Sequence, residues 1–169
     1  MSLERLWAGW RAQYITEVVT ATLDVEGSAD CLFCALGVAS PEESRTVAHD
    51  ETTFAVLNAY PYTSGHVMVA PLRHEGNLDG LDRAEANAVM AMTQRATVAV
   101  RTAYAPDGIN VGMNLGRAAG AGVPGHLHVH VLPRWVGDTN FMTSVAETRV
   151  MPESLATTLE RLRAAWPLL

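Results

Sequence analysis

Three histidines alternate with three apolar residues in the segment HLHVHV, residues 126–131. Successive side chains of an extended strand point to opposite faces, so this spacing predicts a strand with all three imidazoles on one face. The apolar residues Leu127, Val129 and Val131 then point the other way, into a hydrophobic core. The sequence therefore predicts a sheet with a core on one side and a row of imidazoles on the other.

A glycine-rich segment, GRAAGAGVPG at residues 116–125, leads directly into this strand. Glycines let backbone N–H groups approach a ligand with little obstruction from side chains. The alternating histidines alone also fit a solvent-facing strand or a plain metal site. The glycine loop before them and the sequence Leu132-Pro133-Arg134 after them favour a functional site for phosphate chemistry.

The segment from His126 to Leu132 resembles the signature of the histidine triad (HIT) family, His-φ-His-φ-His-φ-φ with φ apolar, at every position. The sequence HVLPRWVGD at 130–138 is similar to the branch of that family that cleaves dinucleoside polyphosphates. Residues 110–116 and 134–141 are more similar still to the diadenosine tetraphosphate phosphorylases of actinobacteria. The resemblance covers about residues 30–142.

This resemblance implies three catalytic histidines, His126, His128 and His130. Neutral imidazole is a competent nucleophile near neutral pH, and the family pattern nominates His128 as the attacker on the α-phosphate. The attack would form a covalent nucleotidyl-histidine, while His130 donates a hydrogen bond to the phosphate or the leaving oxygen. Water as the second acceptor makes the protein a hydrolase. Inorganic phosphate makes it a phosphorylase, which the segment 135–141 favours.

Two other functions stay open on the same residues. One is hydrolysis of the P–N bond of nucleoside 5′-phosphoramidates, which the Leu-Pro-Arg-Trp continuation after the triad disfavours. The other is a zinc-stabilised nucleotide-binding module in which turnover is incidental.

The resemblance also implies residues that bind the nucleotide. Asn58 would bond the ribose hydroxyls, which need polar partners in a buried pocket, although turn capping explains an asparagine there equally well. Asn114 and the backbone amides of the glycine loop would stabilise phosphate oxygens. The nucleotide-binding candidates are Asn58, Asn114, Gly116, Gly122 and Trp135.

Gly122 departs from the family pattern, in which many relatives carry Gln or Ser four residues before the triad. Glycine supplies its amide but no side-chain donor, which puts the acceptor step and the substrate in question. Arg117 and Arg134 are candidates to compensate, with a solvated surface charge as the alternative for each.

Both cysteines of the chain lie in the tetrapeptide CLFC, at Cys31 and Cys34. In a reducing compartment this spacing indicates a redox pair, a metal site or two inert thiols. Two thiolates need two further ligands to complete a four-coordinate zinc site. The resemblance supplies them, because zinc-containing relatives use a later histidine and the first triad histidine, here His74 and His126. The implied zinc is structural, and a requirement for Mg²⁺ stays open.

Short apolar runs bounded by turn residues predict an α+β fold with an antiparallel sheet of about five strands. The predicted strands are 53–57, 66–71, 108–115 and the triad strand. His66 begins the second of them and is interpreted as a structural histidine.

Apolar residues at three- and four-residue steps predict one long helix over 79–104, with Asp82 as its N-cap. A second amphipathic pattern predicts a C-terminal helix that starts at Pro152. Residues 141–145 are expected to form a short edge or interface segment.

The expected organisation is an N-terminal segment (1–30), a HIT domain (31–142) and a C-terminal extension with its helix (143–169). The N-terminal segment has aromatic and apolar residues at near-helical spacing, expected to pack on the core or on a second subunit, with base stacking as the alternative. These residues are Leu6, Trp7, Trp10 and Tyr14.

The chain has 169 residues, 49% of them hydrophobic and 18% charged, which fits one soluble globular domain. A formal net charge of −6 argues against a nucleic-acid or anionic membrane surface. No apolar run approaches the roughly 20 residues of a membrane span, and residues 1–20 lack the layout of a signal peptide, so we expect a cytoplasmic protein. The expected partner is a nucleotide substrate, and the family resemblance suggests a homodimer paired through an edge strand.

Overall fold

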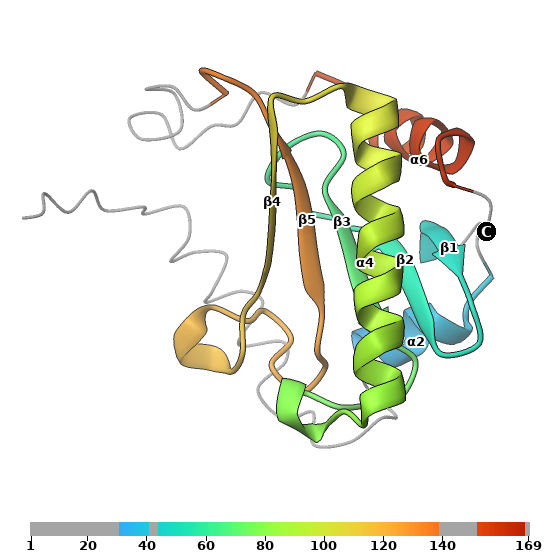
Figure 1. Ribbon diagram of the computed structural model, residues 1–169, viewed down its shortest axis with the longest axis vertical. Helices are drawn as coiled ribbons and strands as arrows, with labels where there is room; N and C mark the ends of the chain where they lie inside the picture. The colour runs from blue at the N-terminus through green and yellow to red at the C-terminus, as the bar shows by residue number, and fades with distance from the viewer. Residues whose placement is uncertain (1–30, 41–43, 139–151, 168–169) are drawn as a thin grey trace, which may run out of the picture.

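The computed structural model describes residues 31–40, 44–138 and 152–167, and shows an α+β fold built on one antiparallel sheet (Figure 1). Its five strands follow the order β1-β2-β3-β5-β4. They are β1 (Thr46–His49), β2 (Thr53–Leu57), β3 (Val67–Pro71), β4 (Gly108–Met113) and β5 (Val129–Arg134). The helices are α2 (Leu32–Val38), α4 (Arg83–Tyr104) and α6 (Leu155–Ala164), with short 3-10 turns η2 (Leu78–Gly80) and η3 (Arg117–Ala119). The predicted fold class is confirmed.

Side-chain alternation along the central strands divides the interior into two hydrophobic clusters. Val67 and Val69 of β3 join Val129 and Val131 of β5 in the cluster under α4. The intervening β3 residue Met68 belongs to the other cluster, on the side of α2. The second cluster comprises Cys31, Phe33, Phe54, Val56, Met68 and Ala70. The sheet thus has a large core on its α4 face and a smaller one, beside the histidines, on its α2 face.

Helix α4 runs along the sheet and starts at a capping box. The Asp82 carboxylate accepts from the Glu85 backbone N–H at 2.9 Å, and the Glu85 carboxylate accepts from the Asp82 N–H at 2.9 Å. These bonds satisfy N–H groups that the first helical turn leaves unpaired. Asp82 is therefore the N-cap, as predicted, and the start expected at residue 79 is wrong because 78–80 form the separate turn η2.

Several boundaries differ from those predicted. Strand β5 starts at Val129, so His126 and His128 lie in the segment that leads into it. Neither strand β1 nor helix α2 is singled out by the sequence pattern, because four residues show only two strand repeats and seven residues only about two helical turns. Helix α6 starts at Leu155, behind the N-cap Ser154, and the predicted start at Pro152 is wrong.

Helix α6 packs on α4 and on the edge strand β1. Leu162 is fully buried in the α4-side cluster. The Arg163 guanidinium donates to the Thr46 carbonyl oxygen at 2.7 and 3.1 Å, which fixes the C-terminal helix to β1. The described part of the C-terminal extension is therefore integrated with the sheet.

The expectations for the N-terminal segment and for residues 141–145 concern positions outside the described residues. The division of the chain at residues 30 and 142 also stays a prediction. Within the described residues, no helix combines the length and apolar character that a membrane span requires.

Candidate active site and metal cluster

The three triad histidines lie in a row on the α2 side of the sheet, and all are buried. His126 is 1% exposed, His128 5% and His130 8%. Strand β5 places His130 between Met68 of β3 and Gly112 of β4. The rings of His128 and His130 meet edge to face, with centroids 5.0 Å apart. The shared face that the alternation predicted is present.

The orientation of His128 is set by the backbone of the residue two positions before it. Its Nδ1–H donates to the His126 carbonyl oxygen at 2.8 Å, because a carbonyl can only accept. The lone pair of the neutral ring is therefore on Nε2. Burial lowers the pKa of His128 below its ordinary value, although the bond to the His126 carbonyl acts in the opposite direction. His128 is thus held as a neutral base with one defined nucleophilic nitrogen.

A second hydrogen-bonded chain fixes His130. The Tyr62 backbone N–H donates to Nδ1 of His66 at 3.2 Å, so the proton of the His66 ring is on Nε2. That Nε2–H points at Nδ1 of His130, 2.9 Å away. His130 consequently accepts at Nδ1 and carries its own proton on Nε2. Burial, with a smaller contribution from His128, lowers the pKa of His130 to about 4.

His66 therefore belongs to the site, which the sequence interpretation as a structural histidine did not anticipate. It is 1% exposed and lies 64 residues from its partner in the chain. The only local signal was its place at the start of a predicted strand. Its distance from the triad in sequence gave no indication that the two rings would meet.

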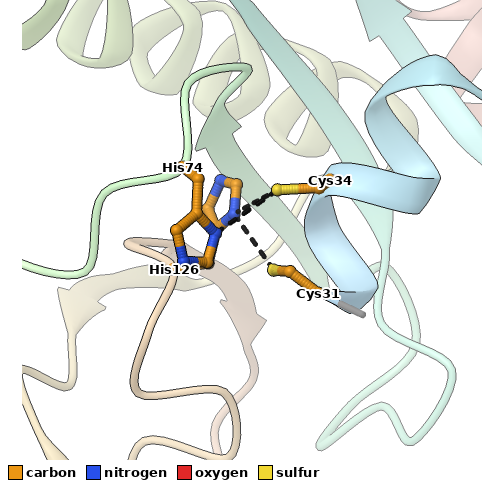
Figure 2. Close-up of side chains that lie close together, drawn as sticks. All are labelled: Cys31, Cys34, His74 and His126. Atoms are coloured by element: carbon orange, nitrogen blue, oxygen red, sulfur yellow. Dashed lines mark hydrogen bonds between the residues drawn. The ribbon is translucent and has the colours of Figure 1, made fainter. Parts of the chain in front are cut away.

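Four side chains form a compact cluster at the other end of the row: Cys31, Cys34, His74 and His126 (Figure 2). Their ligand atoms all lie within 4.8 Å of one another. Nδ1 of His126 is 3.3 Å from the Cys31 sulfur and 3.6 Å from the Cys34 sulfur, and Nδ1 of His74 is 3.3 Å from the Cys34 sulfur. Around tetrahedral zinc, a sulfur and a nitrogen ligand stand about 3.6 Å apart. The cluster has the donor set and the spacing of a Cys2His2 metal site.

The surroundings of the cluster also suit a cation. Nε2–H of His126 donates to the Pro71 carbonyl oxygen at 2.9 Å, which leaves the Nδ1 lone pair facing the sulfurs, as metal ligation requires. Burial raises the pKa of Cys34 to about 11, with a further contribution from the neighbouring Cys31. Two thiols this close resist losing both protons, because the two negative charges would repel each other. A divalent metal bound between the thiolates offsets these charges.

The loop that carries His74 is held from two sides. Arg73 donates to Glu85 at 2.6 Å and to the Gly80 carbonyl oxygen at 2.8 Å, and this guanidinium lowers the pKa of Glu85 to about 2. On the other side, the Leu127 N–H donates to the Glu75 carbonyl oxygen at 2.6 Å. A Cβ on Gly76 would stand 2.7 Å from the Pro124 carbonyl oxygen, so only glycine fits where this loop meets the glycine-rich one.

Asn58, a predicted nucleotide-binding residue, is buried at the end of β2 and its side-chain oxygen accepts from the Tyr60 N–H at 2.9 Å. Asn114 follows β4, and Gly122 lies in the loop before the triad. Gly116 has a φ of 76°, which glycine adopts without strain, and its carbonyl oxygen accepts from the Ala121 N–H at 3.3 Å. The turn-capping interpretation of Asn58 is thus realised, and its ribose contact stays a prediction, as do the phosphate contacts of the loop.

Trp135 is not brought to the triad within one chain. It follows Arg134, the last residue of β5, and its ring packs edge-on against that of Tyr104 of α4, with centroids 6.2 Å apart. Arg134 is engaged elsewhere too, since it donates to both carboxylate oxygens of Asp138 at 2.6 and 2.7 Å and to Asn110 at 2.9 Å. These contacts tie β4 to the turn after β5, so the surface role of Arg134 describes it better than phosphate binding. Arg117 lies in η3.

Comparison with known proteins gives a consistent result. The HIT domain family matches residues 40–136. The AP-4-A phosphorylase of Mycobacterium tuberculosis strain H37Rv is 40% identical over 165 residues, which cover 97% of this chain and 85% of that protein. The structure of a Zn-bound histidine triad family protein from Mycobacterium smegmatis superposes with a TM-score of 0.66 at 30% identity, covering 82% of this chain and 94% of that one. A hypothetical histidine triad nucleotide-binding protein from Sulfolobus tokodaii gives a TM-score of 0.65 at 27% identity, covering 80% and 91%.

Proposed function

The chain belongs to the HIT family, and from this premise we propose that it cleaves dinucleoside polyphosphates such as diadenosine tetraphosphate through a covalent nucleotidyl-histidine on His128. The similarity to an AP-4-A phosphorylase over nearly the whole chain supports this substrate class. The observation that carries the mechanism is the hydrogen bond from His128 Nδ1–H to the His126 carbonyl oxygen, which leaves Nε2 as the nucleophile.

In the first step, the His128 Nε2 lone pair forms a bond to the α-phosphorus while the bond from that phosphorus to the bridging oxygen breaks. The remaining polyphosphate leaves with the electron pair of that bond. The ring becomes positively charged and keeps its proton on Nδ1, where the His126 carbonyl oxygen stabilises it. The Nε2–H of His130, fixed by His66, can donate to a phosphate oxygen as charge redistributes.

In the second step, an acceptor oxygen attacks the same phosphorus and His128 leaves as a neutral imidazole. Phosphate as acceptor yields a nucleoside diphosphate, and water yields a nucleoside monophosphate. The similarity to the phosphorylase of Mycobacterium tuberculosis favours phosphate.

The cluster of Cys31, Cys34, His74 and His126 would hold zinc. Its donor set and spacing, and the Zn-bound relative from Mycobacterium smegmatis, support this assignment. All four protein ligands are present, which is the closed arrangement of structural zinc sites. A metal there would fix the N-terminal end of α2 and the ring of His126. The reaction itself would use His128 and His130.

A homodimer formed along β4 is also part of the proposal. This strand is one of the two edges of the five-stranded sheet, and its Val111 is 49% exposed. Within the described residues no strand pairs with the outer side of β4, and a sheet edge with an exposed apolar side chain invites pairing with a second copy. Sedimentation of the wild type against Val111→Lys tests this, since the charge should shift a dimer toward monomer without changing the fold.

Incubation with diadenosine tetraphosphate, with and without labelled inorganic phosphate, tests the reaction. Phosphorolysis gives ADP plus ATP only when phosphate is present, and the label appears in ADP. Formation of AMP plus ATP, or of two ADP, without phosphate would replace the phosphorylase with a hydrolase. A His128→Gly variant that binds the substrate but still turns it over normally would exclude the covalent mechanism.

A further inference from the structure

One of the two residues between the cysteines of the metal cluster, Phe33, contacts the proposed nucleophile. Phe33 is 2% exposed, and its ring stacks on that of His128 with centroids 4.7 Å apart and an interplanar angle of 24°. The same ring lies 5.4 Å from that of His126. One aromatic side chain therefore packs against a member of the metal cluster and against the nucleophile.

Two members of the metal cluster, Cys31 and Cys34, flank Phe33 in the chain. Cys31 is the N-cap of α2 and Cys34 lies in its first turn, so the two sulfurs that face His126 bracket Phe33 in the chain. The Ala35 N–H donates to the Cys31 carbonyl oxygen at 3.0 Å and closes this first turn. Helix α2 has only seven residues and no side-chain N-cap bond, so it has few restraints of its own.

The ring of His128 needs a restraint on its tilt, and the stacked ring of Phe33 provides one. Its one described hydrogen bond holds Nδ1, which still allows the ring to tilt and so to move Nε2. Phe33 closes one face of the ring, and His130 meets it edge to face with an interplanar angle of 73°. In-line attack requires the nucleophile within a narrow range of distance and direction, and a displacement of about 1 Å can cost roughly 100-fold in rate.

We propose that Phe33 is a positioning residue for His128, and that a metal bound by Cys31, Cys34, His74 and His126 keeps Phe33 against the nucleophile. The inference rests on the proposed function, in which His128 attacks phosphorus. In this proposal the metal cluster restrains the nucleophile through the side chain of Phe33. This restraint is separate from the hydrogen bond between His128 and the carbonyl oxygen of His126, itself a member of the cluster.

The kinetic test compares Phe33→Leu with Phe54→Leu. Both side chains belong to the same α2-side cluster and their rings are 6.4 Å apart, but the ring of Phe54 stacks on His49 and not on the triad. We expect Phe33→Leu to lower kcat about tenfold or more with KM changed less than about threefold, while Phe54→Leu retains kcat. A change of KM alone would mean that Phe33 contacts the nucleotide instead. Equal losses of kcat in both variants would reduce Phe33 to general packing.

A second measurement follows the His128 ring without turnover. NMR of ring-labelled histidine is recorded for wild type and Phe33→Leu, each loaded with Zn²⁺ and after chelation. We expect one sharp His128 signal in Zn²⁺-loaded wild type, broadened either by chelation or by Phe33→Leu, with chelation adding less in the variant than in wild type. An unchanged His128 signal in Zn²⁺-loaded Phe33→Leu would overturn the proposal.

If chelation unfolds the protein, seen as collapse of the amide spectrum, the comparison of the two Zn²⁺-loaded proteins still decides whether Phe33 restrains the ring. If His128→Gly retains turnover, the proposed function fails, and the NMR result still reports whether Phe33 orders that histidine.

Discussion

Nε2 of His66 lies 2.9 Å from Nδ1 of His130, and the direction of this hydrogen bond is fixed by the peptide N–H of Tyr62 on the far side of the His66 ring. A backbone amide thereby determines which nitrogen of His130 carries a proton. Because Nδ1 of His130 accepts from His66, the neutral His130 ring presents its Nε2–H as a donor. The site thus contains a donor imidazole beside a nucleophilic one, each in a defined tautomer.

Replacing His66 tests this chain. His66→Leu removes the donor to His130, and we expect kcat to fall roughly 100-fold with little change in KM. His66→Gln places an amide N–H close to the position of the imidazole Nε2–H, so it should recover most of the loss. Steady-state kinetics on diadenosine tetraphosphate measures both. Equal defects in the two variants would show that His66 serves packing rather than the tautomer of His130.

The stability of the protein should fall in acid through His130. Its pKa is about 4 in the folded protein against 6.5 for an ordinary histidine, so only the unfolded chain takes up this proton between these values. This uptake lowers the free energy of unfolding by about 3 kcal/mol as the pH falls from 6.5 toward 4. Above pH 6.5 neither state takes up the proton, and the full stability is retained.

Urea unfolding at pH 7.5 and at pH 5, for wild type and His130→Gln, measures this effect. The glutamine variant lacks the titrating ring, so the stability advantage of wild type should shrink as the pH falls. A difference between the two proteins that is independent of pH would contradict the prediction.

Zinc should bind in equimolar amount and stabilise the fold. At a free concentration about 1,000 times Kd, binding contributes about 4 kcal/mol, which corresponds to a rise in Tm of about 10 °C for a chain of this length. Because the pKa of Cys34 is about 11 without metal, binding at pH 7.5 should release a proton from that thiol. Calorimetry in buffers of different ionisation enthalpy counts the protons released.

Cys34→Ser should abolish both effects, and His49→Gln provides the control. His49 donates from Nε2 to the Gly37 carbonyl oxygen and lies outside the cluster, so its variant should bind zinc as wild type does. Unaltered zinc affinity in Cys34→Ser would refute the assignment of the cluster.

Gly76→Ala should disturb the loop that carries His74. The new Cβ would stand 2.7 Å from the Pro124 carbonyl oxygen and 3.1 Å from the Gly125 carbonyl carbon, both backbone atoms that cannot move aside cheaply. We expect a loss of about 1–3 kcal/mol in stability and weaker zinc binding. Gly125→Ala is the matched change in the facing loop, where the nearest atoms are those of the His74 ring at 3.8 Å. It should have little effect, and equal losses in both variants would remove the steric explanation.

The parts of the fold that depend on local sequence were predictable. The alternation from His126 to Val131 indicated the shared face of the imidazoles. Asp82 was predictable as the N-cap of α4 because capping is local, although the predicted helix start at residue 79 is wrong. Strand β1 and helix α2 were missed, since four and seven residues carry too little periodicity to be distinguished from a loop.

The site was predictable only in part, for a related reason. Cys34 meets His74 across 40 residues and His126 across 92, and their selection came from family resemblance rather than from spacing. His66 meets His130 across 64 residues, and nothing in its own neighbourhood distinguishes a ring that packs from one that orients a partner. The ring of Trp135 packs against Tyr104 within the chain, and its predicted contact with the nucleotide stays a prediction.

The alternation along β5 has a consequence for how this protein tolerates insertions and deletions. Adding or removing a single residue between His126 and Val131 would exchange the two faces, sending imidazoles into the core and valines toward the substrate. Folding and chemistry share this short frame, so a change of its length would disrupt both. Changes of length early in the glycine-rich loop fall outside it, and a redesign of substrate preference would begin there.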